Sequence, residues 1–281
     1  MTRLGQHFLL SKSVASRMVA TAEITKNDTV LEIGPGKGML TQELLKKAKK
    51  VIAVEKDPKL CTFLKEKFGH LNNFFLIQAD IRDLFPDPEG NPREPLGLPS
   101  GFKVVANIPY YLTGRLLRQL LETPLGNGVS KWERVVLMIQ KEVAKRIITK
   151  KKMNLLSISV QVFSKPKIAF YVSRKNFRPQ PNVDSAVIVL EKRSKDLFKE
   201  HKINQKDFFK LIKTGFRHKR KFLKNNLSPL GRGTSKWLGK CNISLNARAE
   251  DLSLENWACL TSLLFSLTNQ GHHLQGQNSR K

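Results

Sequence analysis

Short apolar runs alternate with segments of helical periodicity through the first two thirds of the chain. Between the runs, apolar residues such as Leu40, Leu44 and Leu45 recur at the spacing of one helix face. This alternation predicts an α/β fold, with a mostly parallel seven-stranded sheet and helices on both of its faces. The predicted strands are residues 29–33, 51–55, 74–78, 103–106, 135–140, 168–172 and 185–190, and the predicted helices are residues 37–47, 58–68, 113–122 and 141–148.

Two segments interrupt this alternation. Residues 86–99 contain five prolines and two glycines, which predicts a long surface loop rather than a helix or strand. In residues 156–163 apolar and polar positions alternate, and that period of two by itself predicts a strand.

Positive charge is concentrated in the last third of the chain. The whole chain of 281 residues has 50 Lys and Arg against 23 acids, a formal charge of +27. Residues 192–240 alone hold sixteen Lys and Arg and three acids. This predicts a polyanionic partner, and nucleic acid is favoured over a membrane surface because no basic amphipathic anchor precedes the fold. We therefore predict a first domain over residues 1–191, a basic nucleic-acid-binding domain over 192–268 and a flexible tail over 269–281.

Residues 213–224 are the most basic stretch and contain no acid. If they form a helix, Arg217, Arg220 and Lys224 lie at i, i+3 and i+7 on one face. Lys213 lies one turn earlier and Lys221 widens the stripe. The pattern predicts a helix whose face contacts RNA phosphates. A solvated surface helix is the alternative, but it does not explain why acids are missing.

Other features narrow the class of protein. No apolar run approaches the roughly 18 residues of a membrane span, and the first ten residues have too short an apolar core for a signal peptide. Three cysteines are too few and too scattered for a disulfide framework or a four-ligand zinc site. We expect a cytoplasmic protein without a metal site.

A glycine loop follows the first predicted strand and opens a helix. Its pattern is E-x-G-x-G-x-G over residues 32–38, and it includes Gly34 and Gly36. A dinucleotide fingerprint needs another glycine where Met39 stands, and a Walker loop needs Gly-Lys-Ser/Thr, which is absent. The remaining match is the loop of S-adenosylmethionine (SAM) methyltransferases. Glu55, at the end of the second strand, is placed to accept the ribose hydroxyls, and Asp80, after the third, to accept the adenine amine. For both acids the alternative is a helix cap or an exposed strand end.

The sequence Asn107-Ile-Pro-Tyr110 follows the fourth predicted strand, at the sheet edge where α/β folds bind ligands. The exocyclic amine of a base is a poor nucleophile because its lone pair is delocalised into the ring. The Asn107 side-chain carbonyl and the Pro109 main-chain carbonyl are suited to accept its two hydrogens and release that lone pair. Tyr110 offers a ring to stack on the base. A proline turn with a buried tyrosine is the structural alternative.

Together these motifs resemble the ribosomal RNA small-subunit adenine N6-dimethyltransferases of the KsgA (RsmA) type. The resemblance implies a Rossmann-like SAM methyltransferase domain, a small C-terminal all-α domain and a helix over residues 156–163. It also implies SAM contacts by His7, Leu9 and Asn107, and a second aromatic, Phe177, against the target adenine. The further matching segments are residues 4–9, 140–146, 177–187 and 216–227. Ser11 and Asn182 depart from the residues common in the family, and neither is a group that we assign to the chemistry.

Three functions compete on these residues. The first is dimethylation of two adjacent adenosines in the 3′-terminal hairpin of small-subunit rRNA, with a role in subunit maturation on an immature particle. The second is the related class that methylates large-subunit rRNA and confers macrolide resistance. The third is a non-catalytic nucleic-acid-binding relative. The segments 140–146 and 183–187 favour the first, and intact Gly34, Glu55, Asp80 and Asn107 favour catalysis. We expect the enzyme to act as a monomer.

Overall fold

The computed structural model describes residues 7–85, 98–122, 132–231 and 233–274, and it separates into two compact units. The first contains the described residues up to 148 together with 164–192. The second contains residues 149–163 and the described residues from 193 onward. The segment 149–163 therefore belongs with the second unit, although the sequence placed it in the first domain.

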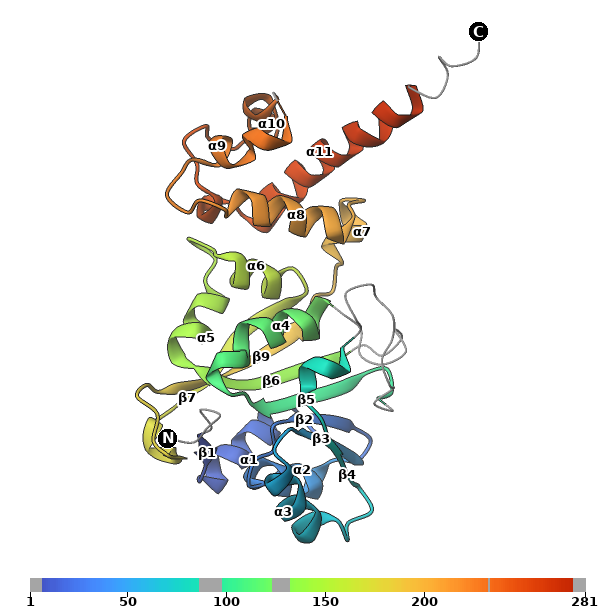
Figure 1. Cartoon of the computed structure of the whole chain (residues 1–281), viewed down its shortest axis with the longest axis vertical. Coiled ribbons are helices and arrows are strands. Elements are labelled where there is room, and N and C mark those ends of the chain that lie inside the picture. The colour runs from blue at the N-terminus through green and yellow to red at the C-terminus, as the bar shows by residue number, and fades with distance from the viewer. Residues whose placement is uncertain (1–6, 86–97, 123–131, 232, 275–281) are drawn as a thin grey trace. The chain divides into compact units, whose positions relative to one another are not determined.

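Seven strands of the described residues form one sheet in the first unit, with the order β4-β3-β2-β5-β6-β9-β7 (Figure 1). Strands β4, β3, β2, β5 and β6 are parallel to one another, and β9 runs antiparallel to both β6 and β7. The mostly parallel α/β sheet predicted from the sequence is confirmed. The strands are β2 (Thr29–Ile33), β3 (Lys50–Glu55), β4 (Phe74–Gln78), β5 (Phe102–Asn107), β6 (Trp132–Gln140), β7 (Ser164–Val172) and β9 (Ser185–Lys192).

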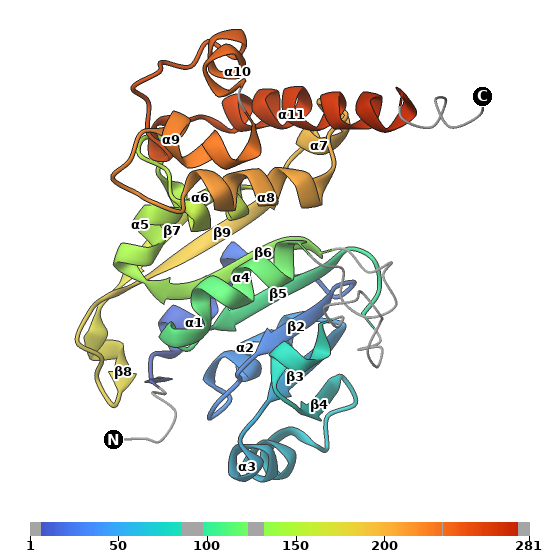
Figure 2. The same ribbon diagram turned by 45° about the horizontal axis from the view of Figure 1, so that its top comes forward.

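Helices cover both faces of this sheet because neighbouring residues of its strands are buried on both sides. Val30, Val105 and Val136 pack in the core with residues of α1 and α2 on one face. The adjacent Val104 and Val135 point to the other face, and they are fully buried too. Helix α4 crosses β5 and β6 in both ribbon views (Figures 1 and 2). The helices of this unit are α1 (Lys12–Thr21), α2 (Met39–Lys47), α3 (Pro58–Phe68), α4 (Thr113–Glu122) and α5 (Lys141–Ile148).

The second unit is helical in its described residues. Its core surrounds the fully buried Trp257 and Phe208. Helix α6 occupies residues for which the alternation predicted a strand and the family resemblance a helix, and the helix is confirmed. Asn154 begins it with a capping box to Ser157. The helices are α6 (Leu155–Gln161), α7 (Leu197–Glu200), α8 (Gln205–Gly215), α9 (Leu223–Leu227), α10 (Thr234–Lys240) and α11 (Leu254–Leu274).

Three features of the second unit bear on the sequence-based expectations. Helix α11 continues through residues 269–274, where a flexible tail was expected. Cys241 and Cys259 form a disulfide between α10 and α11 that the cysteine count did not predict, while Cys61 of the first unit is free and buried. No helix within the described ranges is long and apolar enough to cross a membrane. The predicted proline-rich loop, residues 86–99, lies mostly outside the described residues.

The basic segment is not one helix, so the predicted single helical face is wrong. Helix α8 ends at Gly215, residues 216–222 form turns, and α9 begins at Leu223. The buried Asn226 side chain donates to the carbonyls of Gly215 and His218, at 2.7 and 3.1 Å. A continuing helix would use the Gly215 carbonyl for its own ladder. Trp257 also packs so closely on Gly215 that an added Cβ would clash with its ring.

Candidate active site

A pocket of about 1070 Å³, counted with its solvent-open part, lies at the carboxyl ends of β2, β3 and β5. Parallel strands bring their carboxyl ends to one sheet edge, and this edge is the usual ligand site of open α/β folds. The pocket brings together residues from every predicted cofactor and target motif of the first unit. The predicted residues that line it are His7, Leu9, Gly34, Gly36, Glu55, Asp80, Asn107, Pro109, Tyr110 and Phe177.

The glycine loop is held against the end of β3. The Gly34 amide donates to the carbonyl of Val54 at 2.9 Å, and the Gly36 amide donates to Glu55 Oε2 at 3.2 Å. Gly36 has a φ of +58°, and a Cβ there would lie 3.0 Å from the Phe8 ring. Glycine is favoured at this position because the backbone is left-handed and because a side chain would crowd the Phe8 ring. The loop is thus shaped by packing within the protein as well as by room for a ligand.

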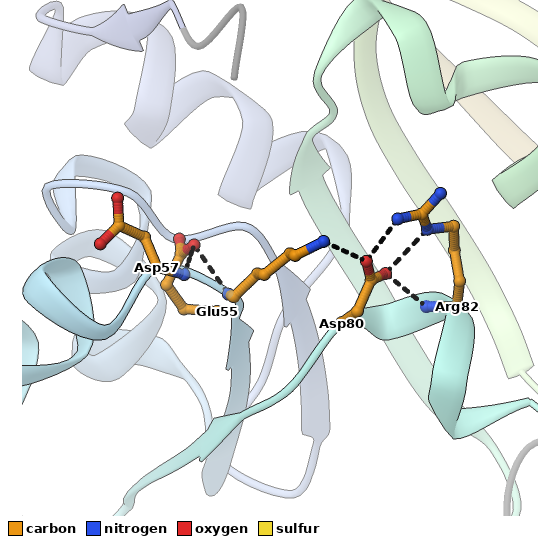
Figure 3. A network of polar contacts seen from close by, with 5 residues as sticks. Glu55, Asp57, Asp80 and Arg82 are labelled. Atoms are coloured by element: carbon orange, nitrogen blue, oxygen red, sulfur yellow. Dashed lines mark hydrogen bonds and ion pairs between the residues drawn. The ribbon is translucent and has the colours of Figure 1, made fainter. Parts of the chain in front are cut away.

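Glu55 is fixed by backbone amides at the end of β3. Its Oε1 accepts from the amides of Lys56 and Asp57, at 2.8 and 3.0 Å (Figure 3). Its Oε2 accepts the Gly36 amide described above. Its side chain is buried. A carboxylate has about four acceptor positions, so these three bonds orient the group and leave it able to accept another donor.

Asp80 caps the short 3-10 helix Ile81–Leu84 and is held in two ion pairs (Figure 3). Its Oδ1 accepts from the Arg82 amide and guanidinium, and its Oδ2 accepts from Arg82 and from Lys56 Nζ. The hydrogen bonds from Arg82 hold the pKa of Asp80 far below its usual range. Asp80 is therefore ionised, and an incoming amine would compete with Lys56, whose side chain is half exposed.

Glu32, the first residue of the glycine motif, is the least expected group in the pocket wall. It is 1% exposed, and neither carboxyl oxygen has a hydrogen-bond partner among the described residues. Burial is the main cause that raises its pKa to about 8. Thr41, which is near but not aligned for a full hydrogen bond, opposes this shift, and the charge of Glu55 adds to it. Glu32 is thus protonated at neutral pH. The glycine motif contained Glu32, but no feature of that motif indicated its protonation.

The N-terminal segment sets the orientation of Asn107. Asn107 Nδ2 donates to the His7 carbonyl at 3.2 Å. A carbonyl oxygen can only accept hydrogen bonds, so it is the amide nitrogen of Asn107 that faces His7. The side-chain oxygen of Asn107 therefore faces away from His7 and remains available as an acceptor. The amide of the next residue, Ile108, donates to the Met138 carbonyl at 3.2 Å, which continues the β5–β6 pairing into the turn. The His7 carbonyl thus orients the Asn107 side chain, and the Ile108 bond fixes the backbone next to it.

The turn at residues 107–110, called the target turn below, is anchored at Tyr110. Its hydroxyl shares a 2.9 Å hydrogen bond with Ser185 Oγ on β9, and burial raises the pKa of this tyrosine. The Pro109 carbonyl accepts from the Leu112 amide at 2.9 Å and keeps one lone pair for another donor. Ser185 lies in the segment that resembled the family, but its bond to Tyr110 could not be read from sequence.

A two-stranded ribbon joins the N-terminal motif to the segment around Phe177. Strand β1 (Phe8–Leu9) pairs antiparallel with β8 (Phe177–Arg178), so Leu9 lies opposite Phe177. His7 Nδ1 contacts the Pro179 carbonyl at 2.7 Å, and the His7 ring lies 5.5 Å from that of Tyr110. Phe177 is buried and reaches both the core and the pocket. The part of the motif at residues 4–6 lies outside the described residues.

The basic segment of the second unit presents exposed charge. Arg217, Lys219, Arg220 and Lys221 lie in the exposed turn region, and none forms an ion pair with any residue that the structure describes. Lys213 is exposed on α8, and Lys224 on α9 is partly buried with its ammonium 5.7 Å from the Phe222 ring. The predicted RNA-binding cations thus gather around a turn rather than along one helix.

Comparison with known proteins shows which family this chain resembles over most of its length. The family model described as "Ribosomal RNA adenine dimethylase" matches residues 1–265. A protein of Dehalococcoides mccartyi named ribosomal RNA small subunit methyltransferase A is 43% identical over 90% of this chain and 84% of its own length. One of the same name from Lactococcus lactis is 38% identical over 94% and 90%.

Two solved structures share the fold over nearly their whole length. The 23S rRNA methyltransferase ErmE is 25% identical, with a TM-score of 0.66 over 92% of this chain and 99% of that one. A dimethyladenosine transferase from Plasmodium falciparum is 24% identical, with a TM-score of 0.71 over 94% and 98%. The second likeness shows the fold alone.

Proposed function

Since this chain belongs to the ribosomal RNA adenine dimethylase family, we propose that it dimethylates the N6 amines of two adjacent adenosines in the 3′-terminal hairpin of small-subunit rRNA. The observation that carries the proposal is one pocket, into which the glycine loop, Glu55 and the turn at Asn107 all open. A methyl donor and an acceptor amine must meet at one point, and this pocket provides it. The small-subunit names of the sequence relatives favour that substrate over large-subunit rRNA.

S-adenosylmethionine is the methyl donor of this family, and the pocket residues fit it. Glu55 retains acceptor capacity for ribose hydroxyls, and Gly36 allows close approach of a ligand to the loop backbone. Gly34, Asp80, His7 and Leu9 complete the predicted contacts in the same pocket wall. When bound, SAM supplies a methyl group that its sulfonium has already activated.

The protein's own task is to hold the amine. The Asn107 side-chain oxygen and the Pro109 carbonyl accept its two hydrogens, which favours a tetrahedral nitrogen with an available lone pair. Tyr110 and Phe177 supply rings against the base. Positioning of this kind contributes roughly 7–11 kcal/mol to a bimolecular transfer. The amine proton passes to water after transfer, so no strong general base is required.

The second unit docks the RNA in this proposal. Lys213, Arg217, Arg220, Lys221 and Lys224 meet phosphates of an immature small subunit, where the target hairpin is accessible. The exposed cations of the turn support this assignment, because on binding they give up no ion pair with a described residue. We expect the enzyme to act as a monomer, because one chain is sufficient to bring the predicted cofactor and target residues into one pocket.

The proposal is tested with tritiated SAM and undermethylated ribosomal subunits. Label is expected in small-subunit rRNA, as N6,N6-dimethyladenosine at two adjacent positions near the 3′ end. Label only in large-subunit RNA would instead assign the macrolide-resistance type of activity. Absence of label in both, with RNA binding retained, would favour a non-catalytic relative.

A further inference from the structure

Tyr171 is an exposed aromatic on an edge strand that is otherwise protected. Strand β7 ends the sheet order, and its first half has Lys165, Pro166 and Lys167, residue types that discourage edge-to-edge association. Tyr171 is 52% exposed, whereas the following Val172 is buried. A single exposed ring is common on protein surfaces, so its neighbours decide whether it is suited to a ligand.

A cation lies over this ring. Lys141, the first residue of α5, places its Nζ 5.1 Å from the Tyr171 ring centroid. Helix α5 and strand β7 lie side by side in both ribbon views (Figures 1 and 2). An aromatic face with an adjacent cation is the combination that single-stranded nucleic acid uses, with a base on the ring and a phosphate near the charge.

This pair adjoins the target turn. Val172 pairs with Ser185, whose hydroxyl bonds to Tyr110 in the pocket. The Lys141 amide donates to the carbonyl of Asp184 at 3.0 Å. Tyr171 itself pairs with Ala186, one strand spacing of about 4.8 Å away, so its backbone is close to that of Ser185 although its ring lies on the opposite face of the sheet.

The surrounding segments are basic. Residues 141–148 and 173–184 together carry six Lys and Arg and two acids. Arg174, Lys175 and Arg178 are exposed in the segment that leads from β7 through β8 toward the pocket. A strand of RNA whose adenosine enters the pocket would find positive charge beside it on this side.

We propose that the Tyr171 ring, with Lys141, is a stacking platform for an unpaired nucleotide next to the adenosine in the pocket. The proposal rests on the proposed function, because it assumes a single-stranded RNA segment at the pocket mouth. It identifies a contact in the catalytic unit that is separate from the basic segment of the second unit.

The chain contains a matched control. Phe75 on β4, at the opposite edge of the same sheet, is 45% exposed and has Lys50 Nζ 4.1 Å from its ring. It lies toward the amino end of its strand, whereas the pocket lies at the carboxyl ends. Phe75→Ala therefore removes the same kind of cation–ring pair away from the proposed RNA path.

The experiment titrates the full chain into hairpin RNAs that carry 2-aminopurine immediately 5′ or 3′ of the acceptor adenosine. Stacking on Tyr171 is expected to quench one of the two probes. Tyr171→Ala and Tyr171→Leu should remove that quenching and raise Kd about tenfold. Tyr171→Phe should retain both, and Phe75→Ala should change neither. Leu preserves apolar bulk on the strand and so guards against a folding defect.

Unchanged quenching and affinity in Tyr171→Ala would overturn the platform, as would an equal effect in Phe75→Ala. These measurements need no turnover. If the wild type fails to methylate small subunits but shows Tyr171-dependent quenching, the platform stands and the proposed function falls. If methylation proceeds without Tyr171-dependent quenching, the reverse holds.

Discussion

The pocket of the first unit and the basic segment of the second hold their polar side chains in opposite ways. In the pocket, Glu55 accepts three backbone amides and Asn107 is oriented by the His7 carbonyl. Around the turn at 216–222, the cations extend into solvent without ion pairs to described residues, and only the backbone beneath them is fixed by Asn226. Chemistry at one atom thus requires fixed side chains, whereas phosphate contact requires charge on a fixed backbone.

Asn107→Ala tests the fixed side chains of the pocket and has the largest expected effect. Methyl transfer should fall about 100-fold or more, because the variant lacks a preorganised acceptor at the reacting amine. Affinity for RNA should stay close to wild type, because Asn107 acts on the amine and not on the phosphates. The control is Asn73→Ala, which removes another side-chain amide that donates to two carbonyls, those of Leu45 and Ala48, outside the pocket. Near-normal turnover of Asn107→Ala would make the turn structural.

Glu32→Gln tests whether the pocket wall holds a neutral acid. The folded pKa of about 8 lies above the ordinary value of 4.5. The stabilisation associated with this raised pKa is therefore fully present below about pH 4.5 and is lost as pH rises through 8. Gln does not titrate, so the variant should match wild type near pH 4.5 and exceed it by a few kcal/mol at pH 9. Urea unfolding across this range measures the difference, and a pH-independent difference would contradict it.

Asn226→Ala tests the backbone support of the basic segment. The carbonyls of Gly215 and His218 lose their common donor, and the bond to Gly215 is buried, so the expected cost is about 2–3 kcal/mol of unfolding free energy. RNA affinity should fall as well, although no cation is removed. Chemical denaturation and RNA titration measure the two effects. Wild-type values in both would show that the turn holds its shape without Asn226.

Glu55→Ala tests the cofactor assignment. SAM affinity should fall by about 1–3 kcal/mol, because the ribose hydroxyls and the Gly36 amide lose an acceptor. Glu55→Gln keeps one carbonyl acceptor and should have a smaller effect. Isothermal calorimetry measures both variants, and unchanged affinity in Glu55→Ala would remove Glu55 from the site.

The triple change of Arg217, Arg220 and Lys224 to Gln has the smallest effect at a single salt concentration and is diagnostic only across a series. The slope of log affinity against log salt should decrease by about 0.7–0.9 for each phosphate that is no longer neutralised, with no change in SAM affinity. A triple Gln variant at Lys26, Lys47 and Lys49 removes equal charge from the first unit and is the control. Equal slopes in both triple variants would place RNA docking elsewhere, with residues 141–152 as the next candidate.

The hydrophobic pattern predicted most strands and helices of the first unit. Five of its segments, including 29–33, 74–78 and 141–148, match the observed bounds, because a buried parallel strand or an amphipathic helix imprints its period on local sequence. The pocket followed from the same logic, since motif residues at strand ends must share one edge. The protonation of Glu32 and the bond between Ser185 and Tyr110 did not follow. Both depend on neighbours distant in sequence.

Local sequence was sufficient for the sheet, the glycine loop, the target turn and the excess of positive charge, since each is encoded within a few adjacent residues. The break of the basic segment at Gly215 instead depends on tertiary contacts. The helical spacing there is real, but Trp257 crowds Gly215 and Asn226 takes the carbonyl that a continuing helix would use. The Cys241–Cys259 bridge and the contact of Lys141 with the Tyr171 ring have the same origin. Local pattern sets which conformations are favourable, and contacts between distant residues select among them.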